Sequence, residues 1–178
     1  MNLRILEKED IDFLSECFND IDFWGEYTNP VHGQISKFDL MGFFDNPASR
    51  AVLIEIRRFI IQKKDGTRIG IVWHFLNQPY EMMEIGYFLI PGERGKGYGT
   101  EVVQLMVDYL FLFKNIVRIQ ATVDVRNKPS QRVLEKNGFR REGIQRKAEF
   151  VRGQWQDEYL YSILREEWKE PKTLTKTK

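Results

Sequence analysis

The sequence predicts a mixed α/β fold, and three of its stretches carry that prediction. An apolar run at residues 83–90, typical of a buried strand, leads through a glycine-rich turn into a helical pattern of apolar residues that reaches Phe113. An Asp-Gly pair at residues 65–66 separates two β-rich segments, which is a strong hairpin signal. Two strand-like segments, at about residues 139–151 and 155–164, close the chain.

The composition is that of one ordinary globular core. The chain has 178 residues, 42% hydrophobic and 13% aromatic, and we expect one domain over residues 1–170 with a frayed tail at 171–178. A formal net charge of +1 argues against a dedicated nucleic-acid binder. The sequence has no apolar run that would span a bilayer and no signal-peptide pattern, and its single cysteine, Cys17, is compatible with a reducing compartment. We therefore expect a cytoplasmic protein with no membrane partner.

The first part of the chain is predicted to form short elements. We expect a strand at residues 3–6, a helix at 9–19, a loop at 20–33 and a helix at 35–44 that stops before Asn46-Pro47. The hairpin strands are predicted at 52–62 and 68–75. Along the second of these, one face should carry Ile69, Ile71, Trp73 and Phe75, and the other Gly70, Val72 and His74.

The second part is predicted to bring two strands side by side. Residues 116–123 should form a strand parallel to 83–90, because a helix connects the two, and the crossover should be right-handed. Asn127 is then expected to cap a short helix, with Pro129 in its first turn and Gly138 after its end. We find no internal repeat and no linker that would mark a second domain.

The glycine-rich turn, residues 91–100, carries the main functional signal. It opens a helix, and a helix N-terminus with bare N–H groups attracts phosphate. Gly95, Gly97 and Gly99 let a ligand approach the main chain closely. Two common phosphate loops do not fit, because Lys96 is followed by glycine rather than Ser or Thr, and one residue rather than two separates Gly97 from Gly99.

The pattern Arg94-x-x-Gly97-x-Gly99 does resemble the acetyl-coenzyme A signature of the GNAT acetyltransferases. The segment from Asn127-Lys128-Pro129-Ser130 to Gly138-Phe139 is similar to the second cofactor-side motif of the ribosomal-protein alanine acetyltransferase (Rim-type) branch. Residues 80–168 match that branch well, whereas residues 1–60 match it only in layout. The first motif alone is moderately specific, and the two at this distance are strong.

The resemblance implies a GNAT-like fold, with a central mixed and mostly antiparallel sheet of about seven strands, a splayed parallel pair and about four helices. Its co-substrate would be acetyl-CoA, with the pantetheine arm between the splayed strands and the pyrophosphate on the glycine turn. The residues implied in cofactor binding are Phe88, Leu89, Ile90, Arg94, Gly95, Lys96, Gly97, Tyr98, Gly99, Thr100, Asn127, Ser130, Arg132 and Lys136. Asn127 is explained equally well as a helix cap.

Acetyl transfer to an amine needs a base for the ammonium, whose pKa is roughly 10, and an acid for the leaving thiolate, whose pKa is about 8.5. For the base we predict Glu84, in the buried strand, although a solvated strand end would explain it as well. Many GNAT enzymes use a tyrosine as the acid, at a position that is Leu134 here. The Rim-type branch offers Ser130 instead, or that serine only caps its own helix.

Cysteine and histidine are not expected to take part. Cys17 lies in an amphipathic helix and should be a small buried hydrophobe, which favours direct transfer. His32 and His74 lack partners at metal-ligand spacing, so no metal is expected, and His74 should fill a polar slot in its strand.

By resemblance, the acceptor enters opposite the cofactor, and the residues implied in its binding are Trp24, Tyr27, Asn29, Trp155 and Asp157. Acidic residues between Glu7 and Glu26 would attract a cationic amine, or they mark a solvated helix face. The acceptor class stays open between a small-molecule amine and a protein N-terminus, and a homodimer is compatible with the sequence.

Two other functions remain open at this stage. The absence of the family tyrosine would fit a non-catalytic acyl-CoA sensor on the same fold. The glycine turn alone would fit a nucleotide-phosphate binder unrelated to coenzyme A.

Overall fold

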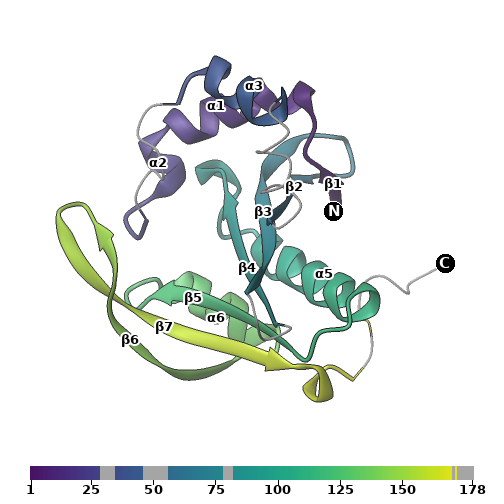
Figure 1. Cartoon of the computed structure of the whole chain (residues 1–178), viewed down its shortest axis with the longest axis vertical. Helices are drawn as coiled ribbons and strands as arrows, with labels where there is room; N and C mark the ends of the chain where they lie inside the picture. Colours follow the sequence, from purple (N-terminus) through teal and green to yellow (C-terminus); the bar gives the residue numbers. More distant parts are fainter. Residues whose placement is uncertain (29–34, 46–55, 78–81, 170, 172–178) are drawn as a thin grey trace.

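The computed structural model describes residues 1–28, 35–45, 56–77, 82–169 and 171, and a seven-stranded sheet runs through them (Figure 1). Its order is β1-β2-β3-β4-β5-β7-β6, and its neighbours are antiparallel except for the parallel pair β4 and β5. The strands are β1 Asn2–Ile5, β2 Ile56–Gln62, β3 Arg68–Asn77, β4 Met82–Leu89, β5 Arg118–Asp124, β6 Arg140–Val151 and β7 Gln154–Leu164. The predicted mixed, mostly antiparallel sheet is confirmed.

Helices cover both faces of the sheet. The α-helices are α1 Ile11–Asn19, α2 Ile21–Trp24, α3 Lys37–Asp45, α5 Tyr98–Phe113 and α6 Lys128–Lys136, and the 3₁₀ turns are η1 Lys8–Asp10, η2 Pro91–Glu93 and η3 Arg165–Glu167. One apolar core lies between the sheet and the long helix α5, and a second lies under α1, α2 and α3 on the opposite face. Within the described ranges, no helix is both long and apolar enough to cross a membrane.

The parallel pair β4 and β5 separates soon after it begins. The strands share three register pairs, Met82 with Arg118, Met83 with Ile119 and Glu84 with Gln120, and none beyond them. β5 remains paired with β7 as far as Asp124, so β4 and β5 diverge beyond Glu84. This divergence opens the sheet at the carboxyl ends of its two parallel strands, where α/β sheets bind ligands.

Two details of the N-terminal half differ from the sequence prediction. A short helix, α2, lies inside the predicted 20–33 loop because the Asp20 carboxylate caps it by accepting from the Asp22 N–H, 2.8 Å away. β3 carries one extra residue, Ile69, between the register pairs Gln62–Arg68 and Ile61–Gly70. Because of this bulge, Ile69 packs in the α5 core instead of sharing a face with Ile71. The predicted strand residues 52–55 and the tail 172–178 lie outside the described residues.

His74 does not occupy the polar slot that the sequence suggested. It is 2% exposed and lies near the rings of Phe59 and Tyr109, with centroids 6.0 Å away in each case. Neither ring nitrogen has a hydrogen-bond partner in the described structure. Burial lowers the pKa of His74 to about 4, so the ring is neutral and serves as core packing.

Candidate active site

The glycine-rich turn lies between η2 and α5, just beyond the end of β4. Gly97 is the N-cap of α5, and both Gly95 (φ 76°) and Gly97 (φ 88°) have left-handed backbones that glycine adopts most readily. A Cβ atom at either position would meet no heavy atom within 4 Å. Since the first N–H groups of a helix have no partner inside it, the turn presents main-chain donors on an open side. It is an anion-binding geometry.

The charged side chains of the turn have protein partners. Lys96 Nζ lies 3.1 Å from Glu93, which also binds Lys63 at 2.6 Å. Arg94 Nε donates to the Leu89 carbonyl at 2.9 Å, and its Nη2 donates to the carbonyl of Phe23 in α2. Arg94 therefore fastens the turn to the N-terminal helices.

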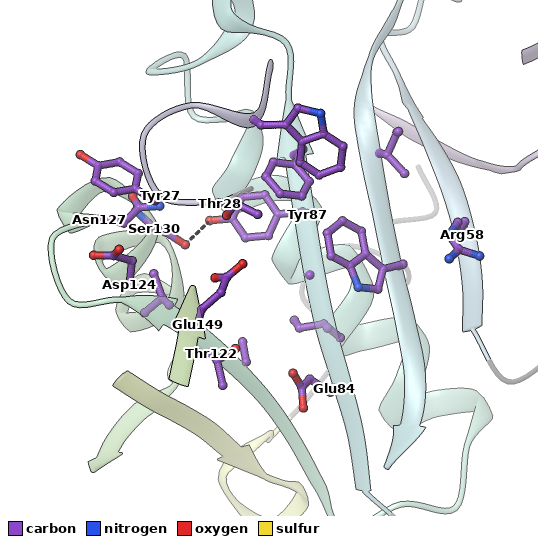
Figure 2. Close-up of a pocket in the computed structure, with 18 of the residues that line it drawn as sticks. Tyr27, Thr28, Arg58, Glu84, Tyr87, Thr122, Asp124, Asn127, Ser130 and Glu149 are labelled. Carbon is purple, nitrogen blue, oxygen red and sulfur yellow. Dashed lines mark hydrogen bonds between the residues drawn. The ribbon is translucent and has the colours of Figure 1, made fainter. Parts of the chain in front are cut away.

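A crevice of about 440 Å³ follows the divergence of β4 and β5 (Figure 2). β4 contributes Glu84 to Phe88, and β5 contributes Ala121 to Asp124. The start of α6 contributes Asn127 and Ser130, and the final strands contribute Glu149 and Glu158. The crevice therefore joins elements from the middle and the end of the chain.

A hydroxyl pair spans the crevice. Tyr87 Oη and Ser130 Oγ are 3.1 Å apart, so a phenol on β4 and a serine in the first turn of α6 share a hydrogen bond (Figure 2). The Asn127 side chain fixes this turn by accepting from the Ser130 N–H at 3.1 Å, which makes it the predicted N-cap. Burial raises the pKa of Tyr87 to about 12, so the phenol stays protonated at neutral pH. Leu134, 1% exposed, adds an apolar side chain to the same wall.

Four carboxylates line the described part of the crevice: Glu84, Asp124, Glu149 and Glu158. Gln120 Nε2 donates to Glu84 at 2.9 Å, and Arg126 pairs with Asp124 at 2.6 Å. Burial, followed by the nearby charge of Glu149, raises the pKa of Glu158 to about 7. The pKa of Glu149 is also raised, by burial and by Asp124. The crevice thus holds one acid, Glu158, that is only partly ionised at neutral pH.

An irregular stretch of β6 brings Glu149 to the crevice. Register is lost between Gln145 and Glu149, and Lys147 there has a φ of 51°. The Lys147 N–H donates to the Asp157 carboxylate at 2.8 Å, which ties the bulge to β7. Figure 2 shows the Glu149 side chain pointing into the crevice, with Thr122 beside it and Glu84 on the opposite side.

The residues expected to bind the acceptor are only partly brought together. Trp24 and Tyr27 line the crevice. Trp155 is 57% exposed and packs against Phe150 on the β6–β7 hairpin, and neither it nor Asp157 belongs to the described lining. Asn29 lies outside the described residues.

The residues expected to bind the cofactor spread over the turn, β4 and α6. Phe88 lines the crevice, while Leu89 and Ile90 pack in the two cores. Gly99 packs closely, because a Cβ there would lie 3.3 Å from Tyr87 and 3.4 Å from Val133. Tyr98 and Thr100 belong to the first turn of α5, and Arg132 and Lys136 are exposed on α6.

The acidic N-terminal segment is engaged in local structure. Asp10 is fully buried and pairs with Arg4 at 2.6 Å and Arg68 at 3.0 Å. Asp12 pairs with Lys37 at 2.7 Å, and Asp20 caps α2. The carboxylates of the crevice come instead from β4, β5, β6 and β7.

Sequence reasoning missed Tyr87, Glu149 and Glu158. Tyr87 stood in an apolar run as one more strand residue, and its hydroxyl meets Ser130 only because β4 and α6 pack together. The position of Glu149 depends on the bulge in β6, and no turn-forming residue in this stretch of the sequence indicates that bulge. Glu158 carried no distinct signal, because it follows Gln156 and Asp157 in the polar first half of β7.

The described residues show no second catalytic centre of another type. Cys17 is buried, and burial raises the pKa of its thiol to about 12, so it is not a thiolate at neutral pH. No group of three or more His, Cys, Asp or Glu side chains within the described ranges has a metal-binding arrangement.

A mixed sheet that splits beside a glycine-capped helix, with titratable groups in the split, defines an acyl-coenzyme A-binding fold. The sequence profile of the acetyltransferase (GNAT) domain matches residues 1–140. The chain belongs to the GNAT acetyltransferase family.

Named relatives agree with this assignment. The chain is 45% identical over 109 residues to the uncharacterized N-acetyltransferase YnaD of Bacillus subtilis, a match that covers 61% of this chain and 64% of YnaD. It is 33% identical over 182 residues to the putative ribosomal N-acetyltransferase YdaF of the same organism, covering 94% and 93%. Its fold is similar to the crystal structure of Vibrio cholerae spermidine N-acetyltransferase in complex with CoA and spermine, with a TM-score of 0.82, 25% identity, and coverage of 93% and 96%.

Proposed function

We propose that this protein transfers an acetyl group from acetyl-CoA to a primary amine, directly and without an acetylated cysteine. The observation that carries the proposal is that one crevice, opening beside the glycine turn, holds both the Tyr87–Ser130 hydroxyl pair and a carboxylate, Glu158, that is partly ionised at neutral pH. Relatives named as spermidine and putative ribosomal acetyltransferases support an amine acceptor.

The open turn fits a diphosphate. We assign the pyrophosphate to the main-chain N–H groups from Gly95 to Thr100, because Gly95 and Gly97 leave their Cβ space empty. The pantetheine arm fits between β4 and β5, where β4 has an unpaired edge beyond Glu84. Arg132 and Lys136, exposed on α6, are available for the remaining nucleotide phosphate.

The amine must lose a proton before or during attack, and we assign that proton to the Glu149–Glu158 pair. Burial and the nearby charge of Glu149 raise the pKa of Glu158 to about 7, close to the working pH, where a base is most effective. Glu84 was the base predicted from sequence. Its charge contributes to the raised pKa of Glu158, so we give it the role of attracting the ammonium and tuning that pair.

The leaving thiolate must gain a proton, and we assign Ser130 as the donor with Tyr87 behind it. The two hydroxyls are hydrogen-bonded, so a proton leaving Ser130 can be replaced from Tyr87. This pair weighs against the sensor alternative. That alternative rested on Leu134 standing where many relatives have tyrosine, and β4 supplies a phenol from another direction.

The acceptor is a small-molecule amine or a protein N-terminus. Trp24 and Tyr27, from the segment that Arg94 fastens to the cofactor turn, border its entrance. Carboxylates at the reacting end attract the cationic form of the amine, which is the dominant form at neutral pH.

Thiol release from acetyl-CoA in the presence of a primary amine tests the proposal. Only the ionised base accepts a proton, so kcat/KM should rise with pH through about 7, where Glu158 ionises. Glu158→Gln should lower kcat/KM by roughly 100-fold and flatten this rise. Glu166→Gln, an exposed glutamate on η3, is the matched control and should keep both the rate and the pH profile. Tight CoA binding without amine-dependent thiol release would refute the enzyme and favour the sensor.

A further inference from the structure

The crevice does not stop at the carboxylates. It continues under α1 and α3 into an apolar end, where aromatic and aliphatic side chains from α1, α2, α3, β3 and β4 form the lining. The side chains that define this end are Phe18, Trp24, Leu40, Trp73 and Phe88. Acetyl transfer itself does not need such a space, since the acyl group and the amine meet at the other end.

The aromatic wall of this end is a connected set of rings. Trp73 stacks on Phe88 with centroids 5.4 Å apart, and Trp24 meets the edge of Phe88 at 4.9 Å. Trp24 also stacks on Phe18 at 5.5 Å and donates its indole N–H to the Phe18 carbonyl at 3.1 Å. Because the indole hydrogen bond is satisfied within the protein, Trp24 presents an apolar face. The wall is preorganised to receive a ring or an alkyl chain.

Gly86 has a specific place in this wall. Trp73 and Gly86 are register partners on β3 and β4, and a Cβ on Gly86 would lie 2.2 Å from the Trp73 ring. Only glycine therefore lets the indole lie against β4 at this level. The ring is seated between Glu84 and Phe88, which share its face of β4.

The spacing along β4 sets the distance between charge and apolar wall. Side chains two residues apart on a strand are about 7 Å apart, so Glu84 and the Trp73 ring over Gly86 are about that far apart. An ammonium among the carboxylates and an apolar group against Trp73 would be joined by a short linker of two or three carbons. Within the described lining, the acids are confined to the reacting end.

We propose that the preferred acceptor is an amphipathic monoamine, in which a short linker joins one ammonium to an aromatic or branched apolar group. The inference rests on the proposed acetyltransferase function and names the acceptor class of the same crevice. A polyamine fits this end less well. Its second ammonium would be desolvated among apolar side chains, and no carboxylate of the described lining lies at this end to pair with it. Arg58, the register partner of Trp73 on β2, adds a basic rather than an acidic group there.

Three amines test the acceptor class on the unmodified protein: phenethylamine, ethylamine and spermidine. Ethylamine has the same reacting group without the apolar body. Burying a ring or chain favours binding, so kcat/KM should be roughly 10- to 100-fold higher for phenethylamine than for ethylamine, mainly through a lower KM. The kcat/KM for spermidine should be no more than about twice that for ethylamine, because spermidine has two primary amines and ethylamine has one.

Substitutions of Trp73 give the matched comparison. Trp73→Ala should lower kcat/KM for phenethylamine about tenfold more than for ethylamine, and Trp73→Phe should restore part of the difference. Titration of each amine into the CoA-bound protein, followed by tryptophan fluorescence, gives a second readout that needs no turnover. Phenethylamine should quench the tryptophan fluorescence at a lower concentration than ethylamine does.

The outcomes separate the two proposals. If thiol is released but spermidine or ethylamine is the best acceptor, the amphipathic class is wrong and the acetyltransferase stands. If no amine releases thiol, the enzyme proposal fails. The fluorescence titration then still decides whether the apolar end prefers phenethylamine, and equal binding of phenethylamine and ethylamine would overturn this inference on its own.

Discussion

Tyr87 illustrates how a residue gains a role that its sequence position does not reveal. In the sequence it is one aromatic residue in an apolar strand, and strand periodicity places it on the face that packs against α5. Its hydroxyl nevertheless reaches Ser130, because β4 and β5 diverge and admit the first turn of α6. Local patterns predicted Ser130 and Asn127, whereas the partner of Ser130 came from packing between distant segments.

In the glycine-rich turn, the backbone conformation of Gly97 leads to a testable prediction. Gly97→Val places a branched side chain at a φ of 88°, where L residues are strained, and fills space that is open in the native turn. The Kd for CoA, measured by calorimetry, should rise at least tenfold. Gly92→Ala is the matched control, since Gly92 has no left-handed backbone and also has open space around its Cβ position. If both variants bind CoA like the wild type, the turn is not the phosphate site.

At the scale of elements, the sequence predicted most of the helices and strands near the site but not their irregularities. The strand predicted at 83–90 is β4, and the helix predicted after Asn127 is α6. Periodicity and capping are local signals, so these elements followed from a few neighbouring residues each. The bulge at Ile69, the register break before Glu149 and the short helix α2 depend on tertiary packing or on one side-chain cap, so no pattern of neighbouring residues predicted them.

The C-terminus of α5 depends on one side chain. Arg165 donates to the carbonyls of Phe111, Lys114 and Ile116, with Nε to Ile116 at 2.6 Å and Nη1 to Phe111 at 2.8 Å. Arg165→Ala leaves these carbonyls without their charged donor, and we expect a loss of about 2–4 kcal/mol in the free energy of unfolding.

Urea denaturation measures this loss as a lower midpoint with an unchanged slope. Arg140→Ala is the control, because the Arg140 side chain is 78% exposed and pairs with Glu167 on the surface. Its effect should stay below about 1 kcal/mol. Equal, small effects of the two substitutions would show that Arg165 does not hold the end of α5.

At the scale of the whole molecule, the site is a product of topology. The glycine turn and the Asn127 helix were recognisable in sequence because each follows a strand that ends at the same edge of the sheet. Two of the four crevice carboxylates, Glu149 and Glu158, come from β6 and β7, beyond the 1–140 segment that the family profile matches. The acidic N-terminal segment, which drew notice in the sequence, is used for caps and ion pairs instead. This agrees with the second of the two interpretations of that segment, in which its acids belong to the local structure of the helices.

The most direct test of this account is amide hydrogen exchange with and without CoA. Protection should increase at residues 95–100, whose N–H groups would bind the diphosphate, and along the part of β4 beyond Glu84, whose free edge would pair with the pantetheine arm. The η3 turn, Arg165–Glu167, contacts the opposite, C-terminal end of α5 and should not change. If CoA binds but leaves the exchange of residues 85–100 unaltered, the cofactor lies elsewhere and the account is contradicted.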